Sequence, residues 1–155
     1  MTDADPINVL IVEDEVLLAT ELGYLVEEVG YRAVGHAMTS SEAVALAREW
    51  HPHLALVDVH LSDGPTGIEV ARLIAEDCGG VALFMTANVK RLPEDFAGAC
   101  GVIGKPYSEY AVKAALKYLG YCLRYGVAPG MPPAGLQIAP AFAELWGLSD
   151  LPKAG

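Results

Sequence analysis

Short apolar runs alternate along this chain with segments whose apolar side chains recur at helical spacing. The runs lie near residues 7–12, 32–37, 53–58, 81–85 and 101–104. Short apolar runs of this length, bounded by turn signals, are typical of buried parallel strands. The helical spacing predicts helices over 15–29, 40–50, 66–77 and 107–124, and a short, weak one over 89–98. Ser40 or Ser41 is the expected N-cap of the second helix.

Five strands that alternate with five helices predict an α/β fold. Successive parallel strands joined by helices form right-handed crossovers, and the helices cover both faces of the sheet. The composition agrees, since 53% of the residues are hydrophobic and only 19% are charged. A chain of 155 residues is long enough for one domain with a substantial core.

The composition shifts at Gly126. Residues 126–155 hold five of the ten prolines, and proline removes a backbone donor and disfavours helix interiors. We therefore predict one domain over 1–125 and a proline-rich tail over 126–155, with no output domain. The apolar stretch from Phe142 to Leu148 either packs back on the domain or serves as a docking segment for a partner.

Polar side chains follow four of the predicted strands at the point where each strand ends. Glu13 and Asp14 follow the first run, Asp58 ends the third, Thr86 follows the fourth and Lys105 follows the fifth. In an open parallel sheet, ligands bind outside the carboxyl ends of the strands. These side chains are therefore expected to converge on one pocket with three carboxylates, one hydroxyl and one ammonium.

Four motifs in this order resemble a known family. From Pro6 to about Arg124 the chain resembles a response-regulator receiver domain, the phosphate-accepting half of two-component signalling. The resemblance implies a doubly wound, flavodoxin-like fold, with a five-stranded parallel sheet of order 2-1-3-4-5 and five flanking helices. The motifs are Val12-Glu13-Asp14-Glu15, Leu56-Val57-Asp58, Met85-Thr86-Ala87 and Gly104-Lys105-Pro106-Tyr107.

The resemblance also implies a role for each site residue. Asp58 would take a phosphoryl group from a phosphohistidine of a histidine kinase or a histidine phosphotransferase, while Lys105 and Thr86 would bind phosphoryl oxygens. Crowded carboxylates stay ionised only beside a cation, and hard oxygen ligands favour Mg²⁺. The implied Mg²⁺ ligands are Glu13 (directly or through water), Asp14, Asp58 and the backbone carbonyl of His60.

The chain departs from the family pattern at a few positions. Val102 stands three residues before the lysine, where receivers commonly place an aromatic switch residue. His60 and Asn88 occupy two positions that tune phosphate lifetime in the family, and Tyr107 replaces a common phenylalanine. The Lys105–Pro106 peptide bond is often cis in the family.

Charge and cysteine content limit the class of partner and the cellular compartment that we expect. The net charge is −10, from 20 acidic and 10 basic residues, which argues against nucleic-acid binding. Three widely spaced cysteines lack metal or redox spacing and suggest reduced thiols in a cytoplasmic protein. The start lacks a signal-peptide pattern, and no apolar run approaches the ~20 residues of a membrane span.

We expect a signalling protein rather than an enzyme, one that catalyses only its own phosphorylation and dephosphorylation. It would act on an unknown downstream protein or as a phosphate sink, with the surface around the fourth helix, fifth strand and fifth helix as output or homodimer face. One alternative is a pseudo-receiver that binds partners without phosphotransfer. Another is a phosphatase of the haloacid dehalogenase kind, although His60 stands where that family has a second aspartate. A flavodoxin role is disfavoured by the acids after the first strand.

Overall fold

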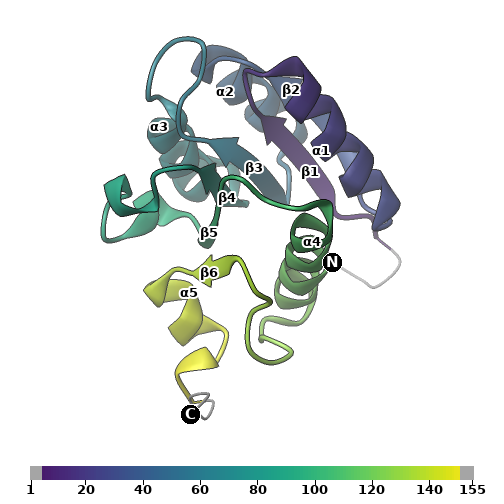
Figure 1. The fold of residues 1–155 in the computed structure, drawn as a ribbon, viewed down its shortest axis with the longest axis vertical. Helices are drawn as coiled ribbons and strands as arrows, with labels where there is room; N and C mark the ends of the chain where they lie inside the picture. Colours follow the sequence, from purple (N-terminus) through teal and green to yellow (C-terminus); the bar gives the residue numbers. More distant parts are fainter. Residues whose placement is uncertain (1–4, 151–155) are drawn as a thin grey trace.

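One sheet of six strands organises the chain (Figure 1). The computed structural model describes residues 5–150. The strand order is β2-β1-β3-β4-β5-β6; the first five strands are parallel and β6 runs antiparallel to β5. The strands are β1 (Asn8–Val12), β2 (Arg32–Ala37), β3 (Leu54–Asp58), β4 (Val81–Thr86), β5 (Gly101–Gly104) and β6 (Leu136–Ile138).

Four longer helices within residues 5–150 flank the parallel strands, and a fifth, short helix belongs to the tail. They are α1 (Val16–Glu28), α2 (Ser40–Trp50), α3 (Gly67–Leu73), α4 (Glu109–Tyr125) and α5 (Pro140–Leu145). A π-helical turn, η1 (Ile74–Cys78), extends α3. The predicted cap of α2 is off by one or two residues, because Thr39 accepts the hydrogen bond from the amide of Glu42.

The core has two halves, one on each face of the sheet. Successive side chains of a strand point to opposite faces, so Val9 and Ile11 pack with α1 and α4, whereas Leu10 and Val12 pack with α2 and α3. All four side chains are almost completely buried. Because both faces are covered, the carboxyl ends of β1, β3, β4 and β5 are held in fixed positions at one edge.

The predicted five-stranded sheet is wrong in its strand count, although the flavodoxin-like order 2-1-3-4-5 is present within it. The sixth strand comes from the tail and pairs Gly101 with Ile138 and Ile103 with Leu136. The amide of Ala139 also donates to the carbonyl of Cys100 at 2.8 Å. A side chain on Gly101 would overlap the backbone of β6, so glycine at this position permits the close approach.

The tail packs back on the domain, which is one of the two alternatives left open by the sequence. Trp146 is 3% exposed and joins the core half formed with α1 and α4. The hydroxyl of Tyr118 in α4 donates to the carbonyl of Gly130 at 2.7 Å. Figure 1 shows β6 and α5, in yellow-green and yellow, at the β5 end of the sheet. That residues 126–155 carry no output domain stays a prediction.

The predicted helix over 89–98 is also wrong. The segment forms two 3₁₀ turns, η2 (Val89–Arg91) and η3 (Phe96–Gly98). Pro93 lies between them and has no amide hydrogen for a helix. Phe96 and Ala97 have φ values of 54° and 51°, which lie in the left-handed region and end any right-handed helix.

No helix within residues 5–150 combines the length and apolar character that a bilayer span requires. The three cysteines are free and buried, so they serve as packed thiols within the core.

Candidate functional site

Three of the predicted site residues meet at the carboxyl edge of the sheet. Glu13 follows β1, Asp58 is the last residue of β3, and Lys105 follows β5. The Nζ atom of Lys105 donates to Oδ2 of Asp58 at 2.8 Å and to Oε1 of Glu13 at 3.0 Å. Strand ends far apart in the sequence therefore bring two carboxylates onto one ammonium, as predicted.

This ion triad is largely shielded from water. The side-chain exposure is 2% for Glu13, 12% for Asp58 and 19% for Lys105. Burial favours the neutral amine of Lys105, but hydrogen bonds to Asp58 and Glu13 outweigh this effect and raise its pKa above the ordinary value. The lysine is therefore a fixed positive charge at any physiological pH.

Glu13 has an unusual proton affinity. Burial is the main cause that raises its pKa from 4.5 to about 7, and the neighbouring Asp58 adds to the effect, while Lys105 opposes it. The ammonium of Lys105 thus does not fully offset the effect of burial on Glu13. The site has a deficit of positive charge that a cation would fill.

The three acids form a cluster suited to a metal ion. Ligand oxygens of Glu13, Asp14 and Asp58 all lie within 4.8 Å of one another. A set of carboxylate oxygens that includes the half-buried Asp14 matches the preference of Mg²⁺ for hard ligands and retained waters. The donor set therefore fits the predicted ion.

His60 lies beside this cluster. Its backbone amide donates to Oδ1 of Asp58 at 3.1 Å, and its side chain is exposed. The role predicted for its backbone carbonyl, a ligand to Mg²⁺, stays a prediction.

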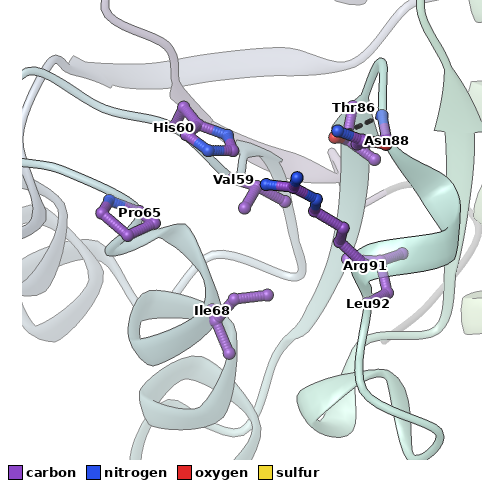
Figure 2. A pocket seen from close by; sticks show the side chains of 8 residues that line it. All are labelled: Val59, His60, Pro65, Ile68, Thr86, Asn88, Arg91 and Leu92. Carbon is purple, nitrogen blue, oxygen red and sulfur yellow. Dashed lines mark hydrogen bonds between the residues drawn. The ribbon is translucent and has the colours of Figure 1, made fainter.

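Thr86 lies at the end of β4, 4% exposed, on the other side of β3 from Glu13. Its Oγ1 accepts a hydrogen bond from the amide of Asn88 at 3.1 Å, which leaves the hydroxyl proton available for donation. Thr86 lines a cavity of about 260 Å³ together with Val59, His60, Pro65, Ile68, Asn88, Arg91 and Leu92 (Figure 2). Thr86 is thus placed beside the cavity rather than in direct contact with the acids.

Sequence reasoning missed Arg91 in this cavity. No motif or periodicity marks it, since its place depends on the turn η2, which the sequence predicted as helix. A basic residue a few positions after the strand-end threonine was the one available signal.

The loop that carries Lys105 is tied to the neighbouring strand. The amide of Lys105 donates to the carbonyl of Thr86 at 2.8 Å. The Lys105–Pro106 bond is cis, as the resemblance implied. Tyr107 follows, and its hydroxyl is buried without a hydrogen-bond partner within residues 5–150. Burial raises the pKa of Tyr107 to about 12, so the phenol remains neutral.

Val102, at the position of the usual aromatic switch, is 1% exposed and packs in the core half with α2 and α3. A branched aliphatic side chain at this position cannot switch between a buried and an exposed rotamer as an aromatic side chain does. Any signal from the site must leave by another route than the swing of an aromatic ring at this position.

Comparison with known proteins gives the family. Residues 9–117 match the family model described as the response regulator receiver domain. The chain belongs to this family. Receiver domains are signalling proteins rather than classical enzymes, in agreement with the prediction, and the match sets aside the phosphatase alternative.

Two curated relatives illustrate the match. The chain is similar to the phyllosphere-induced regulator PhyR of Methylorubrum extorquens, with 34% identity over 111 residues that cover 70% of this chain and 42% of PhyR. It is similar to the transcriptional regulatory protein PdtaR of Mycobacterium tuberculosis, with 39% identity over 113 residues that cover 69% of this chain and 55% of PdtaR. The chain thus spans about half the length of these relatives.

Solved receiver structures share the fold. The solution structure of the PhyR receiver domain from Erythrobacter litoralis superposes with a TM-score of 0.66 and 29% identity, covering 81% of this chain and 96% of that one. A mutant of the anti-anti-sigma factor PhyR from Bartonella quintana gives a TM-score of 0.64 and 31% identity, covering 77% of this chain and 52% of that one.

Proposed function

We propose that the chain is a cytoplasmic phosphoacceptor of a two-component phosphorelay, which receives a phosphoryl group on Asp58 in an Mg²⁺-dependent reaction. The donor would be a phosphohistidine of a histidine kinase or a histidine phosphotransferase. The observation that carries the proposal is the contact of Lys105 with both Asp58 and Glu13, beside a cluster of three carboxylates. This arrangement supplies a nucleophile, a fixed ammonium and a cation site within a few ångströms.

The reaction needs placement and charge neutralisation more than covalent help. A carboxylate oxygen of Asp58 attacks phosphorus, the P–N bond breaks, and its electron pair leaves with the imidazole, which takes up a proton. The ammonium of Lys105, which is hydrogen-bonded to Asp58 in this structure, would move to a phosphoryl oxygen. The hydroxyl of Thr86 would donate a hydrogen bond to another phosphoryl oxygen. Bound at Glu13, Asp14 and Asp58, Mg²⁺ would neutralise the charge of the acids and of the phosphoryl group.

A docking surface for the donor lies next to the acids. Val16 and Leu17 at the start of α1 are 56% and 85% exposed, which is unusual for apolar side chains beside a charged site. A groove of about 380 Å³ is lined by Leu18, the next residue of α1, and by Glu21, Ala87, Lys105, Pro106 and Tyr107. An apolar helix face that carries the phosphohistidine would fit here and would bring phosphorus to Asp58.

The output would be a protein contact. The acidic charge disfavours nucleic acid, and the Bartonella relative is named an anti-anti-sigma factor, a name for a protein that acts through other proteins. The face formed by β5 and the following helix is partly covered by the tail, since β6 pairs with β5 and Trp146 packs in the core half of α4. A homodimer through this face would have to form around the tail or displace it.

The pseudo-receiver is the second candidate, and the buried Val102 favours it. It predicts the same fold without a chemical reaction. Beryllofluoride, an analogue of the phosphoryl group, separates the two candidates. Mg²⁺-dependent binding at the site supports the phosphoacceptor, and a lack of binding supports the pseudo-receiver.

The direct test is phosphorylation by a small donor. The full chain is incubated with acetyl phosphate or phosphoramidate, with Mg²⁺ or with EDTA, and its intact mass is measured. We expect the mass of one added phosphoryl group with Mg²⁺, and no addition for Asp58→Asn or with EDTA. Equal addition to wild type and Asp58→Asn would refute the assignment.

A further inference from the structure

The cavity beside Thr86 has an unusual lining for so acidic a protein. None of its eight lining residues is a carboxylate, although the chain has 20 acids against 10 basic residues. Its polar groups are the hydroxyl of Thr86, the amide of Asn88, the imidazole of His60 and the guanidinium of Arg91. Each of these groups can donate a hydrogen bond, so the lining suits an anion.

Arg91 brings a guanidinium to the cavity, and it forms no salt bridge with an acid within residues 5–150. Arg72, by contrast, is paired with Asp95 at 3.1 Å, and Lys113 is paired with Glu28 at 3.2 Å. Figure 2 shows the Arg91 side chain reaching from η2 into the cavity, toward Val59 and the end of β4. A guanidinium held here without a carboxylate partner is free to bind oxygens of an incoming anion.

The local backbone explains why this arginine reaches the cavity. The amide of Arg91 donates to the carbonyl of Asn88 at 3.0 Å, which closes the 3₁₀ turn directly after Thr86 and its neighbours. Leu92 lines the same cavity with its apolar side chain. Lys90, in the same turn, is exposed and does not line the cavity. The turn therefore places one of two adjacent, exposed cations along the cavity.

The cavity adjoins the phosphoacceptor. Val59 and His60, which line it, directly follow Asp58 in the chain, and Thr86 borders it from β4. Lys105 lines the groove beside α1 instead, together with Leu18 and Glu21. Lys105 therefore lines a groove on the α1 side of the sheet, and Arg91 lines a cavity on the α3 side.

We propose that this cavity is an anion site for the phosphoryl group on Asp58, with Arg91 as a second cationic ligand of its oxygens. The inference rests on the proposed function and goes beyond it, because it assigns a phosphate-binding role to a residue outside the receiver motifs. Arg91 also covers the side of the phosphoryl group that faces His60 and Asn88, where an attacking water would approach. Loss of Arg91 would therefore weaken phosphoryl binding and shorten the life of the aspartyl phosphate.

The test compares Arg91→Gln with the control Lys90→Gln. The control also removes one positive charge, but from the neighbouring side chain, which does not line the cavity. Affinity for beryllofluoride with Mg²⁺ and the half-life of the phosphorylated protein are measured on the full chain. We expect Arg91→Gln to lower the affinity for beryllofluoride and the half-life of the phosphorylated protein by about 3- to 10-fold each. This is the effect of losing one partly exposed charge-assisted hydrogen bond. Arg91→Lys should lose part of the effect, because it keeps the charge but not the planar fork, and Lys90→Gln should remain within about twofold of wild type.

The outcomes separate the two proposals. If wild type binds beryllofluoride and Arg91→Gln equals Lys90→Gln, the role of Arg91 is wrong while the proposed function stands. If wild type and every variant fail to bind beryllofluoride and to take up phosphate, the proposed function itself is wrong. Titration of Asp58→Asn with inorganic phosphate identifies the source of the anion, since Arg91-dependent binding of free phosphate there would overturn the assignment to phosphoaspartate. Melting curves of the Arg91 and Lys90 variants should coincide with that of wild type, because both side chains are exposed.

Discussion

Replacement of Gly101 by alanine should detach the tail from the sheet. The added Cβ would overlap the carbonyl oxygen of Gln137 and lie 3.3 Å from Cα of Ile138, both in the backbone of β6. Backbone atoms of a paired strand do not yield as a flexible side chain does. Strand β6 must therefore move away from β5 for the methyl group to fit.

The expected cost follows from the contacts that β6 would lose. Its three paired residues and the bond from Ala139 to Cys100 hold the tail on β5. At about 1 kcal/mol for each backbone hydrogen bond, the loss of two or three costs roughly 2–3 kcal/mol. Full exposure of Trp146 would add about 4–6 kcal/mol, from roughly 150–250 Å² at ~25 cal/mol per Å². We expect the loss of these bonds together with partial exposure of Trp146, so the free energy of unfolding should fall by more than about 2–3 kcal/mol and by less than the roughly 6–9 kcal/mol of full detachment.

Tryptophan fluorescence and urea unfolding measure the effect. Trp146 is 3% exposed, so displacement should shift its emission to longer wavelength, and Trp50→Phe removes the contribution of the second tryptophan. The matched control is Gly104→Ala in the same strand, where the new Cβ would meet only Val89 at an ordinary 3.8 Å. Both variants share the change in unfolded-chain entropy, so their difference isolates the steric term.

If Gly101→Ala keeps the wild-type emission and matches Gly104→Ala in stability, β6 does not pair with β5 as described. If Gly101→Ala fails to fold, Gln137→Pro tests the same strand pairing, because it places proline in β6 opposite Val102. That variant should expose Trp146 while the parallel sheet retains its circular dichroism. An unchanged Trp146 emission in both variants would contradict the packing of the tail.

Two further predictions concern the acid cluster. Without metal, the pKa of Glu13 rises from 4.5 unfolded to about 7 folded, so its contribution to stability is present below pH 4.5 and is lost as the pH rises through 7. At 1.36 kcal/mol per pKa unit this amounts to about 3 kcal/mol. Urea unfolding in EDTA should show this decline for wild type and not for Glu13→Gln, and equal pH profiles would refute it. Mg²⁺ should raise the melting temperature of wild type, and Asp14→Asn should weaken this response at least about tenfold in Mg²⁺ concentration; an undiminished response would exclude Asp14 as a ligand.

Much of the site could be predicted because parallel strands place their carboxyl ends at one edge. Any two of Asp58, Glu13 and Lys105 are at least 45 residues apart in the sequence. Each stands at the end of an apolar run, and the sheet brings the two acids within hydrogen-bond distance of Lys105. Local pattern and sheet topology agree here, so the convergence required no information on side-chain packing.

The errors arise where tertiary contacts override local pattern. Strand β6 has only three residues between Pro133 and Pro140, too short for a period-2 signal, and it exists because the edge of β5 is available for pairing. The segment over 89–98 has helix-compatible composition, but Pro93 and the left-handed Phe96 and Ala97 break it into turns. The same turns place Arg91, so the wrongly predicted helix and the overlooked arginine have one cause.

The residue to which phosphate becomes attached decides whether Asp58 is the phosphoacceptor. Wild-type protein is phosphorylated with a small donor and Mg²⁺, the acyl phosphate is reduced with borohydride, and the modified residue is identified by peptide mass spectrometry. We expect a single homoserine at position 58, and none when Mg²⁺ is left out of the phosphorylation. Conversion at another acid, or none at position 58 despite uptake of phosphate, would contradict this assignment.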